Sequence, residues 1–152
     1  MRYAGVSNFS VELLEEARAA LARHSPAPLV CNQVLYNLEN RQIERSVLPR
    51  CRELGITVMA YSPVGKGRPA SPGSRGWALL EELGRRYGCT PHQIALAWVI
   101  RQAGVVAIPK ASRPEHVRQN AAAAELELAA RDVARLEAAF PPGPADLEVR
   151  YL

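Results

Sequence analysis

The chain alternates four times between a short apolar stretch and a segment with helix signals, and this order limits the folds that it can adopt. The apolar stretches lie at residues 3–7, 29–36, 56–61 and 105–109. Strands that alternate with helices in this way lie parallel, because each helix returns the chain to the same edge of the sheet. The sequence therefore predicts an α/β fold with four parallel strands.

Helix signals fill each gap between the apolar stretches. Ser10 is placed to cap a helix at 11–24, and Thr90 opens a capping box before a helix that is apolar on all sides and therefore buried. The helix that Gly55 ends contains Pro49, so it either begins late or bends. A long loop is predicted at 62–75, further helices near 79–87, 114–124 and 131–140, and an extended C-terminal tail at 141–152.

Composition is that of an ordinary globular protein. The 152 residues suffice for one domain, and 48% of them are hydrophobic. The net charge of +4 comes from scattered arginines, which does not indicate a nucleic-acid partner. Three distant cysteines and three histidines without ligand spacing predict reduced thiols, a cytoplasmic location and no metal site. No signal-peptide pattern and no apolar run of membrane-spanning length occurs, so no membrane partner is expected.

The fourth apolar stretch leads into a candidate phosphate site. Residues 105–108 are unbroken apolar, which predicts a strand covered on both faces. Ser112 and Glu115 form a capping-box pattern at the start of the next helix. The free N–H groups of that helix start, together with Lys110 and Arg113, predict a site for an anion. The alternative is an ordinary capped helix with two surface cations.

Polar or aromatic side chains follow the other strands directly. Because the carboxyl ends of parallel strands meet at one edge of a sheet, we expect these side chains to share a site. Asn8 and Gln33 offer amides for a ligand carboxamide, and Tyr61 offers a face for a flat ring. Ser62 and Lys66 offer a hydroxyl group and a charge for phosphate groups. These parts fit a nicotinamide dinucleotide; the alternative is that the amides cap loops and Tyr61 packs in the core.

No Gly-x-Gly-x-x-Gly fingerprint is present, so a Rossmann-type site is not expected. Instead, four motifs resemble those of the aldo-keto reductases in order and spacing. They are Gly5–Phe9, Asn32–Asn37, Ala60–Pro63 and Ile108–Lys110, and the segment Gln93–Ile100 resembles the family's buried helix. The resemblance implies a TIM (β/α)8 barrel, of which residues 1–152 form the second half, strands five to eight with their helices. Ala-Phe-Pro-Pro at 139–142 is similar to small bacterial members that reduce aldehydes such as methylglyoxal.

The resemblance implies NADP(H) as the cofactor and a carbonyl compound, an aldehyde or ketone, as the substrate. Ser7, Asn8 and Gln33 would hold the nicotinamide carboxamide, and Tyr61 would stack on the nicotinamide ring. Ser62 and Val64 would lie along the pyrophosphate, Lys110, Ser112 and the start of the next helix would hold the adenosine 2′-phosphate, and Gln119 and Asn120 would lie near the adenine. The remaining cofactor-binding candidates are Pro63, Lys66, Ile108, Arg113 and His116. Ala111 and His116 stand where many members have a phosphate-binding Ser and Arg, which leaves NAD(H) as an alternative cofactor.

The family's catalytic Asp, Tyr, Lys and His belong to its first four strand–helix units, and no second copy of them occurs here. No catalytic residue is therefore expected in this chain, which we expect to be inactive alone. Four strands cannot close a barrel of this type. One hypothesis is a fragment, because Met1-Arg2-Tyr3 stands where members commonly have Val-Arg-Tyr. The other is a homodimer that closes a barrel, with a dinucleotide-binding or structural role.

Overall fold

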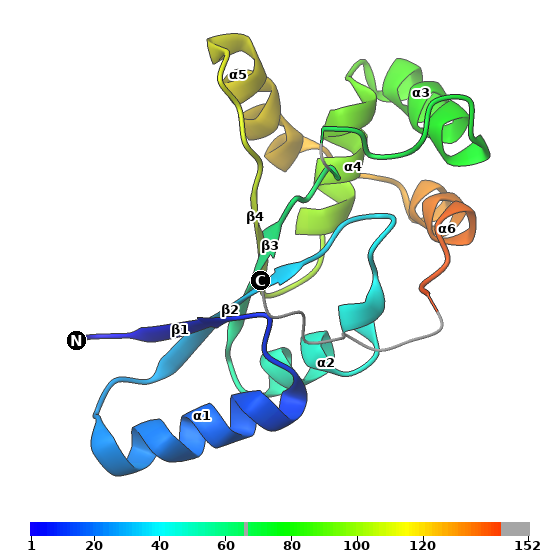
Figure 1. Ribbon diagram of the computed structural model, residues 1–152. Helices are drawn as coiled ribbons and strands as arrows, with labels where there is room; N and C mark the ends of the chain where they lie inside the picture. Colours follow the sequence, from blue (N-terminus) through cyan, green and yellow to red (C-terminus); the bar gives the residue numbers. More distant parts are fainter. Residues whose placement is uncertain (66, 144–152) are drawn as a thin grey trace.

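The computed structural model describes residues 1–65 and 67–143 and contains four parallel strands in the order β1-β2-β3-β4 (Figure 1). The strands are β1 (Ala4–Ser7), β2 (Leu29–Leu35), β3 (Thr57–Tyr61) and β4 (Val105–Ile108). Each lies inside its predicted apolar stretch, and all neighbouring pairs are parallel, as predicted. Lys66 and residues 144–152, the end of the predicted tail, lie outside the described residues.

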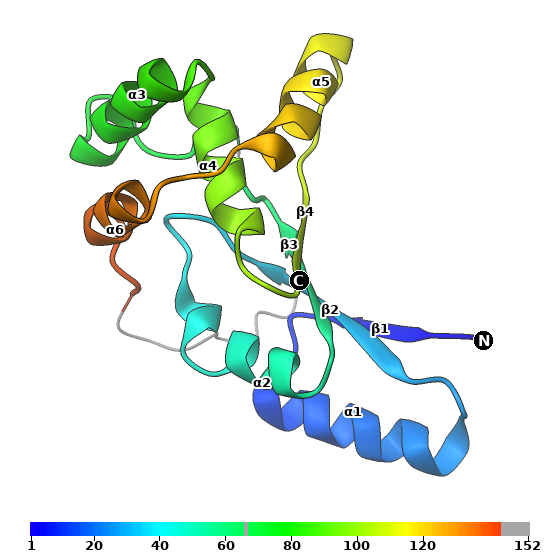
Figure 2. The same ribbon diagram turned by 180° about the vertical axis from the view of Figure 1, so that it is seen from behind.

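Helices connect the strands and follow the last one. They are α1 (Val11–His24), α2 (Val47–Glu53), α3 (Arg75–Tyr87), α4 (Pro91–Ile100), α5 (Pro114–Ala122) and α6 (Ala130–Ala139), with short 3-10 turns at η1 (Gln42–Glu44) and η2 (Ala123–Glu125). Figures 1 and 2 show α1 and α2 below the strands, α3 and α6 together to one side, and α5 projecting beyond the end of β4.

Local signals explain where most helices begin. The Thr90 hydroxyl accepts a hydrogen bond from the Gln93 backbone N–H at 3.3 Å, and the Gln93 side chain accepts one from the Thr90 N–H at 3.0 Å. Ser10 caps α1 by accepting a hydrogen bond from the N–H of Leu13. α2 begins late, after the η1 turn, so Pro49 lies in its first turn, where a missing N–H breaks no helical bond.

The predicted capping box at the start of α5 is wrong. The N-cap of α5 is Arg113, and no side chain caps the helix there. Pro114 takes the first helical position, to which its fixed φ is suited, and this places Ser112 one residue too early to cap. The first-turn N–H groups of α5 therefore have no side-chain cap.

The helices cover one face of the sheet and leave the other open. On the covered face Val34, Val58 and Ala60 are completely buried, whereas on the open face Val106 and Ile108 are 46% and 43% exposed. The prediction that residues 105–108 form a strand covered on both faces is therefore wrong. An unbroken apolar run does not distinguish a strand buried on both faces from one whose second face is open.

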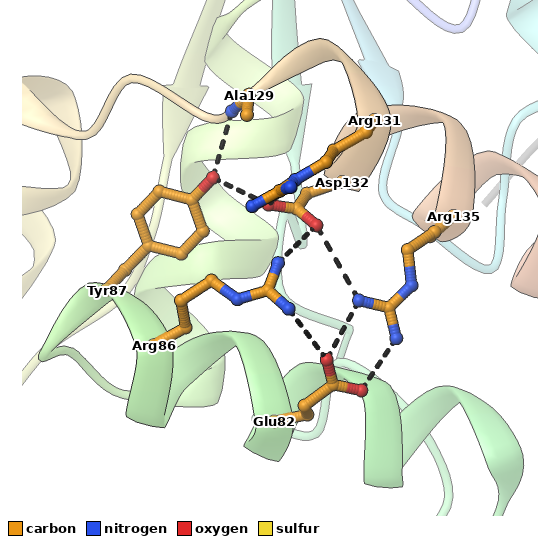
Figure 3. A network of polar contacts seen from close by, with 7 residues as sticks. All are labelled: Glu82, Arg86, Tyr87, Ala129, Arg131, Asp132 and Arg135. Carbon is orange, nitrogen blue, oxygen red and sulfur yellow. Dashed lines mark hydrogen bonds and ion pairs between the residues drawn. The ribbon is translucent and has the colours of Figure 1, made fainter.

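An ion-pair network joins α3 to α6 around the buried carboxylate of Asp132, which is 1% exposed (Figure 3). This carboxylate accepts hydrogen bonds from Arg86 at 2.6 Å and from the Tyr87 hydroxyl at 2.9 Å. Arg135 donates hydrogen bonds to Glu82 from its two terminal guanidinium nitrogens at 2.8 and 2.6 Å. Burial alone would raise the pKa of Asp132, but the bonds from Tyr87 and Arg86 lower the pKa below its ordinary value.

Two strand ends carry backbone strain. Asn8, directly after β1, has φ of 57°, and Ser62, directly after β3, has φ of 48°. Asn tolerates this left-handed region better than Ser does, and a strained residue costs about 1–3 kcal/mol. Such residues persist where the surrounding structure holds them, and they gather at functional sites. Both lie at the carboxyl edge of the sheet.

We expect Asp132→Asn to lower the urea concentration at which the chain unfolds at neutral pH, because Arg86 loses one of its two charged partners, Asp132 and Glu82. The pKa of Asp132 is lowered from 3.8, so its stabilising charge is present above that pH and is lost as the pH falls through the lower folded value. The variant and the unaltered protein should therefore unfold at more similar urea concentrations below pH 3.8. Exposed Glu127, replaced by Gln, serves as the control; a difference that is independent of pH would contradict this role of Asp132.

We expect Ser62→Val to reduce the free energy of unfolding by about 1–3 kcal/mol, because a β-branched side chain is strongly disfavoured at positive φ. Ser62→Gly should stay within about 1 kcal/mol of the original, because glycine adopts this conformation freely. Urea unfolding followed by circular dichroism measures both. An equal loss of unfolding free energy in the two variants would show that the stability depends on the hydroxyl group of Ser62 rather than on its backbone conformation.

Candidate functional site

The strand register brings the predicted residues to one edge and one face of the sheet. Ser7 lies beside Gln33, and Tyr61 lies beside both Leu35 and Ile108. Because side chains alternate along a strand, Gln33 and Leu35 point to the same side of the sheet. Ser7, Gln33, Tyr61 and Ile108 therefore share the open face near the carboxyl ends of their strands.

Ser7 and Asn8 are fixed against the end of β2. The Ser7 hydroxyl donates to the carbonyl oxygen of Gln33 at 3.0 Å, and the backbone N–H of Asn8 donates to the same oxygen at 2.8 Å. Within the described residues, no hydrogen-bond partner occupies the side-chain amide of Asn8 or Gln33. Both side chains are partly exposed, so these amides can meet a ligand. The alternative that they cap loops is not what the described residues show.

The loop after β3 begins with a compact turn. Tyr61 and Ser62 are partly exposed, Pro63 is buried, and Val64 is half-buried. The Ser62 carbonyl oxygen accepts a hydrogen bond from the N–H of Gly65 at 3.0 Å. Pro63 therefore packs inward, Ser62 stays partly exposed, and Val64 packs partly against the core. The predicted residue Lys66 lies outside the described residues.

The predicted phosphate residues lie after β4 and along α5. Lys110, Ser112, Arg113 and His116 are all exposed, and no residue of α5 is buried. Gln119 and Asn120 are half-buried, farther along the helix. Three cationic or ionisable side chains therefore stand around a helix start whose N–H groups have no side-chain cap, which suits an anion.

A surface hollow of about 520 Å³ lies elsewhere, at the turn between α3 and α4. Its lining consists of Glu81, Gly84, Arg85, Gly88, Cys89, Thr90, Pro91, Gln93 and Gln119. Gln119 alone of these residues belongs to the predicted set. The strand-end residues thus form an open edge, and this hollow is a separate feature.

Two residues that hold the site were not among the predicted site residues. Asn37 donates a hydrogen bond to the carbonyl oxygen of Ser62 at 2.9 Å, and Asn32 exchanges two hydrogen bonds with the backbone of Phe9. Both asparagines are buried. The sequence signal was present, because a polar amide inside or directly after an apolar strand must find a partner there.

Other ionisable groups inside the fold have pKa values that burial raises. The Tyr36 hydroxyl is buried and donates to Glu44 at 2.7 Å, and burial first, then Glu44, raises the pKa of Tyr36. Cys31, Cys51 and Cys89 are free thiols, and burial raises the pKa of Cys51 to about 11. Among the described residues, no group of His, Cys, Asp and Glu side chains could hold a metal ion, and no helix could span a membrane.

Comparisons with known proteins agree on one family. Residues 1–140 match the model of the "Aldo/keto reductase family". Methylglyoxal reductase YeaE of Escherichia coli is 43% identical over 110 residues, which are 72% of this chain and 39% of that protein. Probable aldo-keto reductase 1 of Glycine max is 28% identical over 94% of this chain and 47% of that protein. The chain thus spans less than half the length of these curated relatives.

Solved structures show the same correspondence. An aldo/keto reductase from Klebsiella pneumoniae, solved in complex with NADP and acetate, is 36% identical with a TM-score of 0.85, and the match covers 99% of this chain and 52% of that one. The thermostable aldo-keto reductase Tm1743, solved with the inhibitor epalrestat, is 42% identical with a TM-score of 0.79, over 90% of this chain and 48% of that one. The four strands and their helices thus have the architecture of one half of a (β/α)8 barrel, and the chain belongs to the aldo-keto reductase family.

Proposed function

We propose that this chain provides the NADP(H)-binding half of an aldo-keto reductase that reduces aldehydes or ketones. The observation that carries the proposal is the pair of unoccupied amides, Asn8 and Gln33, beside Tyr61 at one edge of the sheet. The Klebsiella pneumoniae relative, 36% identical over 99% of this chain, was also solved with NADPH. The placement of these side chains and the similarity to this relative both support NADP(H) as the cofactor.

The residues present fit the parts of this cofactor. A carboxamide needs one acceptor and one donor, and the side chains of Asn8 and Gln33 supply both. The ring of Tyr61 offers a face to the nicotinamide. The surface of Ser62 and Val64 would lie along the pyrophosphate, and Lys110, with Ser112 and Arg113 near the start of α5, would bind the adenosine 2′-phosphate. Bound NADPH would supply the hydride, and these residues would hold and orient the cofactor.

The proton that carbonyl reduction requires would come from outside the groups present here. A general acid must reach the substrate oxygen, and Tyr36 is buried with its hydroxyl bonded to Glu44. Tyr61 is assigned to the nicotinamide face instead. We therefore propose that the family's catalytic acid–base residues are absent from this chain and that it is inactive alone.

The substrate class that we propose is small reactive aldehydes. The name of the 43% identical relative from Escherichia coli gives methylglyoxal as its substrate. A carbonyl compound of this size needs few contacts with the protein, which suits the open edge of the sheet. The three free thiols fit a reducing compartment, and we place the protein in a bacterial cytoplasm.

A second candidate function follows from the open face of the sheet. Val106 and Ile108 are exposed there, and β1 and β4 are the edge strands of the sheet. Exposed apolar faces and unpaired edges favour association. A homodimer that pairs two such halves would be a dinucleotide-binding or structural protein without catalytic residues. Gel filtration at several concentrations distinguishes a dimer from a monomer.

We expect the 152-residue chain to bind NADPH, measured by quenching of its tryptophan fluorescence, and to consume none with methylglyoxal above a buffer blank. Gln33→Leu should weaken NADPH binding about tenfold, equivalent to about 1.4 kcal/mol for the lost hydrogen bonds. Gln102→Leu, far from the carboxyl edge, is the matched control. Undiminished binding by Gln33→Leu would contradict the carboxamide assignment, and clear turnover would contradict the absence of catalytic groups.

We expect His116→Arg to increase the preference for NADPH over NADH about tenfold, because the planar fork of a guanidinium group can pair with a phosphate through two hydrogen bonds and an imidazole cannot. The measurement is the ratio of the two dissociation constants. Val117→Arg adds the same charge at the next exposed position of α5 and is the control. An equal gain in both variants would indicate general charge attraction rather than a phosphate contact at position 116.

A further inference from the structure

Two buried asparagines lie beside the two left-handed turns of the carboxyl edge. The turns at Asn8 and Ser62 follow β1 and β3, the strands on either side of β2. Asn32 belongs to β2 and is fully buried, and Asn37 follows β2 and is 3% exposed. One central strand and its continuation therefore present an amide to each neighbouring turn.

The backbone of the residues that follow Asn37 orients its side chain, which donates to the second turn. Its side-chain oxygen accepts hydrogen bonds from the backbone N–H groups of Glu39 at 3.0 Å and Asn40 at 2.9 Å. Its side-chain nitrogen is thereby directed at the carbonyl oxygen of Ser62, 2.9 Å away. The same oxygen accepts the N–H of Gly65, so Asn37 fixes the point from which the loop after β3 begins.

Asn32 holds the first turn through both halves of its amide. Its oxygen accepts a hydrogen bond from the N–H of Phe9 at 3.3 Å, and its nitrogen donates to the carbonyl oxygen of Phe9 at 3.0 Å. Phe9 follows Asn8 directly, and the N–H of Asn8 is bonded to the carbonyl oxygen of Gln33. The left-handed residue Asn8 is therefore held on both sides.

We propose that Asn32 and Asn37 are positioning residues of the dinucleotide site and that each serves one end of the nicotinamide half of the ligand. Asn32 keeps Asn8 aimed at the carboxamide, and Asn37 keeps the Ser62 turn shaped for the pyrophosphate. Both tasks need a donor and an acceptor together, which an amide has and a carboxylate or an alkyl group lacks. This inference rests on the proposed function.

Amide hydrogen exchange tests the positioning without any ligand. Asn37→Asp keeps the acceptor and removes the donor, so exchange should quicken at Gly65 and stay unchanged at Phe9. Asn32→Leu removes the acceptor of the Phe9 N–H, so exchange should quicken at Phe9 and stay unchanged at Gly65. Asn40→Ala removes a donor to the Asn37 oxygen but leaves both turns bonded, so it is the control. If Asn32→Leu fails to fold, the Phe9 amide of the unaltered chain decides, because its hydrogen bond to Asn32 must protect it from exchange.

Ligand binding tests what the positioning does. We expect each variant to bind NADPH about tenfold more weakly, as for the loss of a well-placed hydrogen bond. Adenosine 2′-monophosphate, which lacks the pyrophosphate and would bind near the start of α5, should keep its affinity within about twofold. A general loss of structure would weaken the binding of both ligands to the same extent.

Three results would overturn the inference: unchanged exchange at both turns, unchanged NADPH affinity in folded variants, or an equal loss for the two ligands. Failure of the unaltered chain to bind NADPH is a different outcome, because it contradicts the proposed function. In that case the exchange patterns still decide whether these asparagines hold the turns.

Discussion

Backbone hydrogen bonds between β2 and its two neighbours set the register on which the rest of the structure depends. They place Ser7 beside Gln33 and Leu35 beside Tyr61. Because side chains alternate along a strand, a slip of one residue would turn Gln33 towards the helices and Asn32 towards the open face. The register therefore decides both which amide meets a ligand and which amide supports the backbone behind it.

The open face follows from the same arrangement. Each crossover returns its helix to one side of the sheet, so the other side keeps exposed apolar residues such as Val106 and Ile108. In the relatives, a chain of about twice this length supplies further structure. The groups that we propose bind the cofactor lie next to this exposed apolar surface, so whatever covers this face also borders the proposed cofactor site.

Sequence reasoning predicted the four parallel strands, the capping box at Thr90 and the residues that gather at the carboxyl edge. These depend on local patterns, namely helix caps, apolar runs and polar residues directly after strands. It failed at Ser112, where the spacing to Glu115 fitted a capping box but Pro114 fixed the helix start one residue later. It also failed for the open face of β4, because an apolar run carries no information on how many layers cover it. The supporting roles of Asn32 and Asn37 depend on contacts with Phe9 and Ser62, each more than twenty residues away in sequence.

The central claim is that one ligand lies along the carboxyl ends of all four strands. Backbone amide chemical shifts followed during an NADPH titration test it most directly. The claim predicts that signals from Asn8, Gln33, residues 61–64 and residues 110–120 shift together, with a single dissociation constant. Shifts confined to the hollow at the turn between α3 and α4, or none at all, would contradict it.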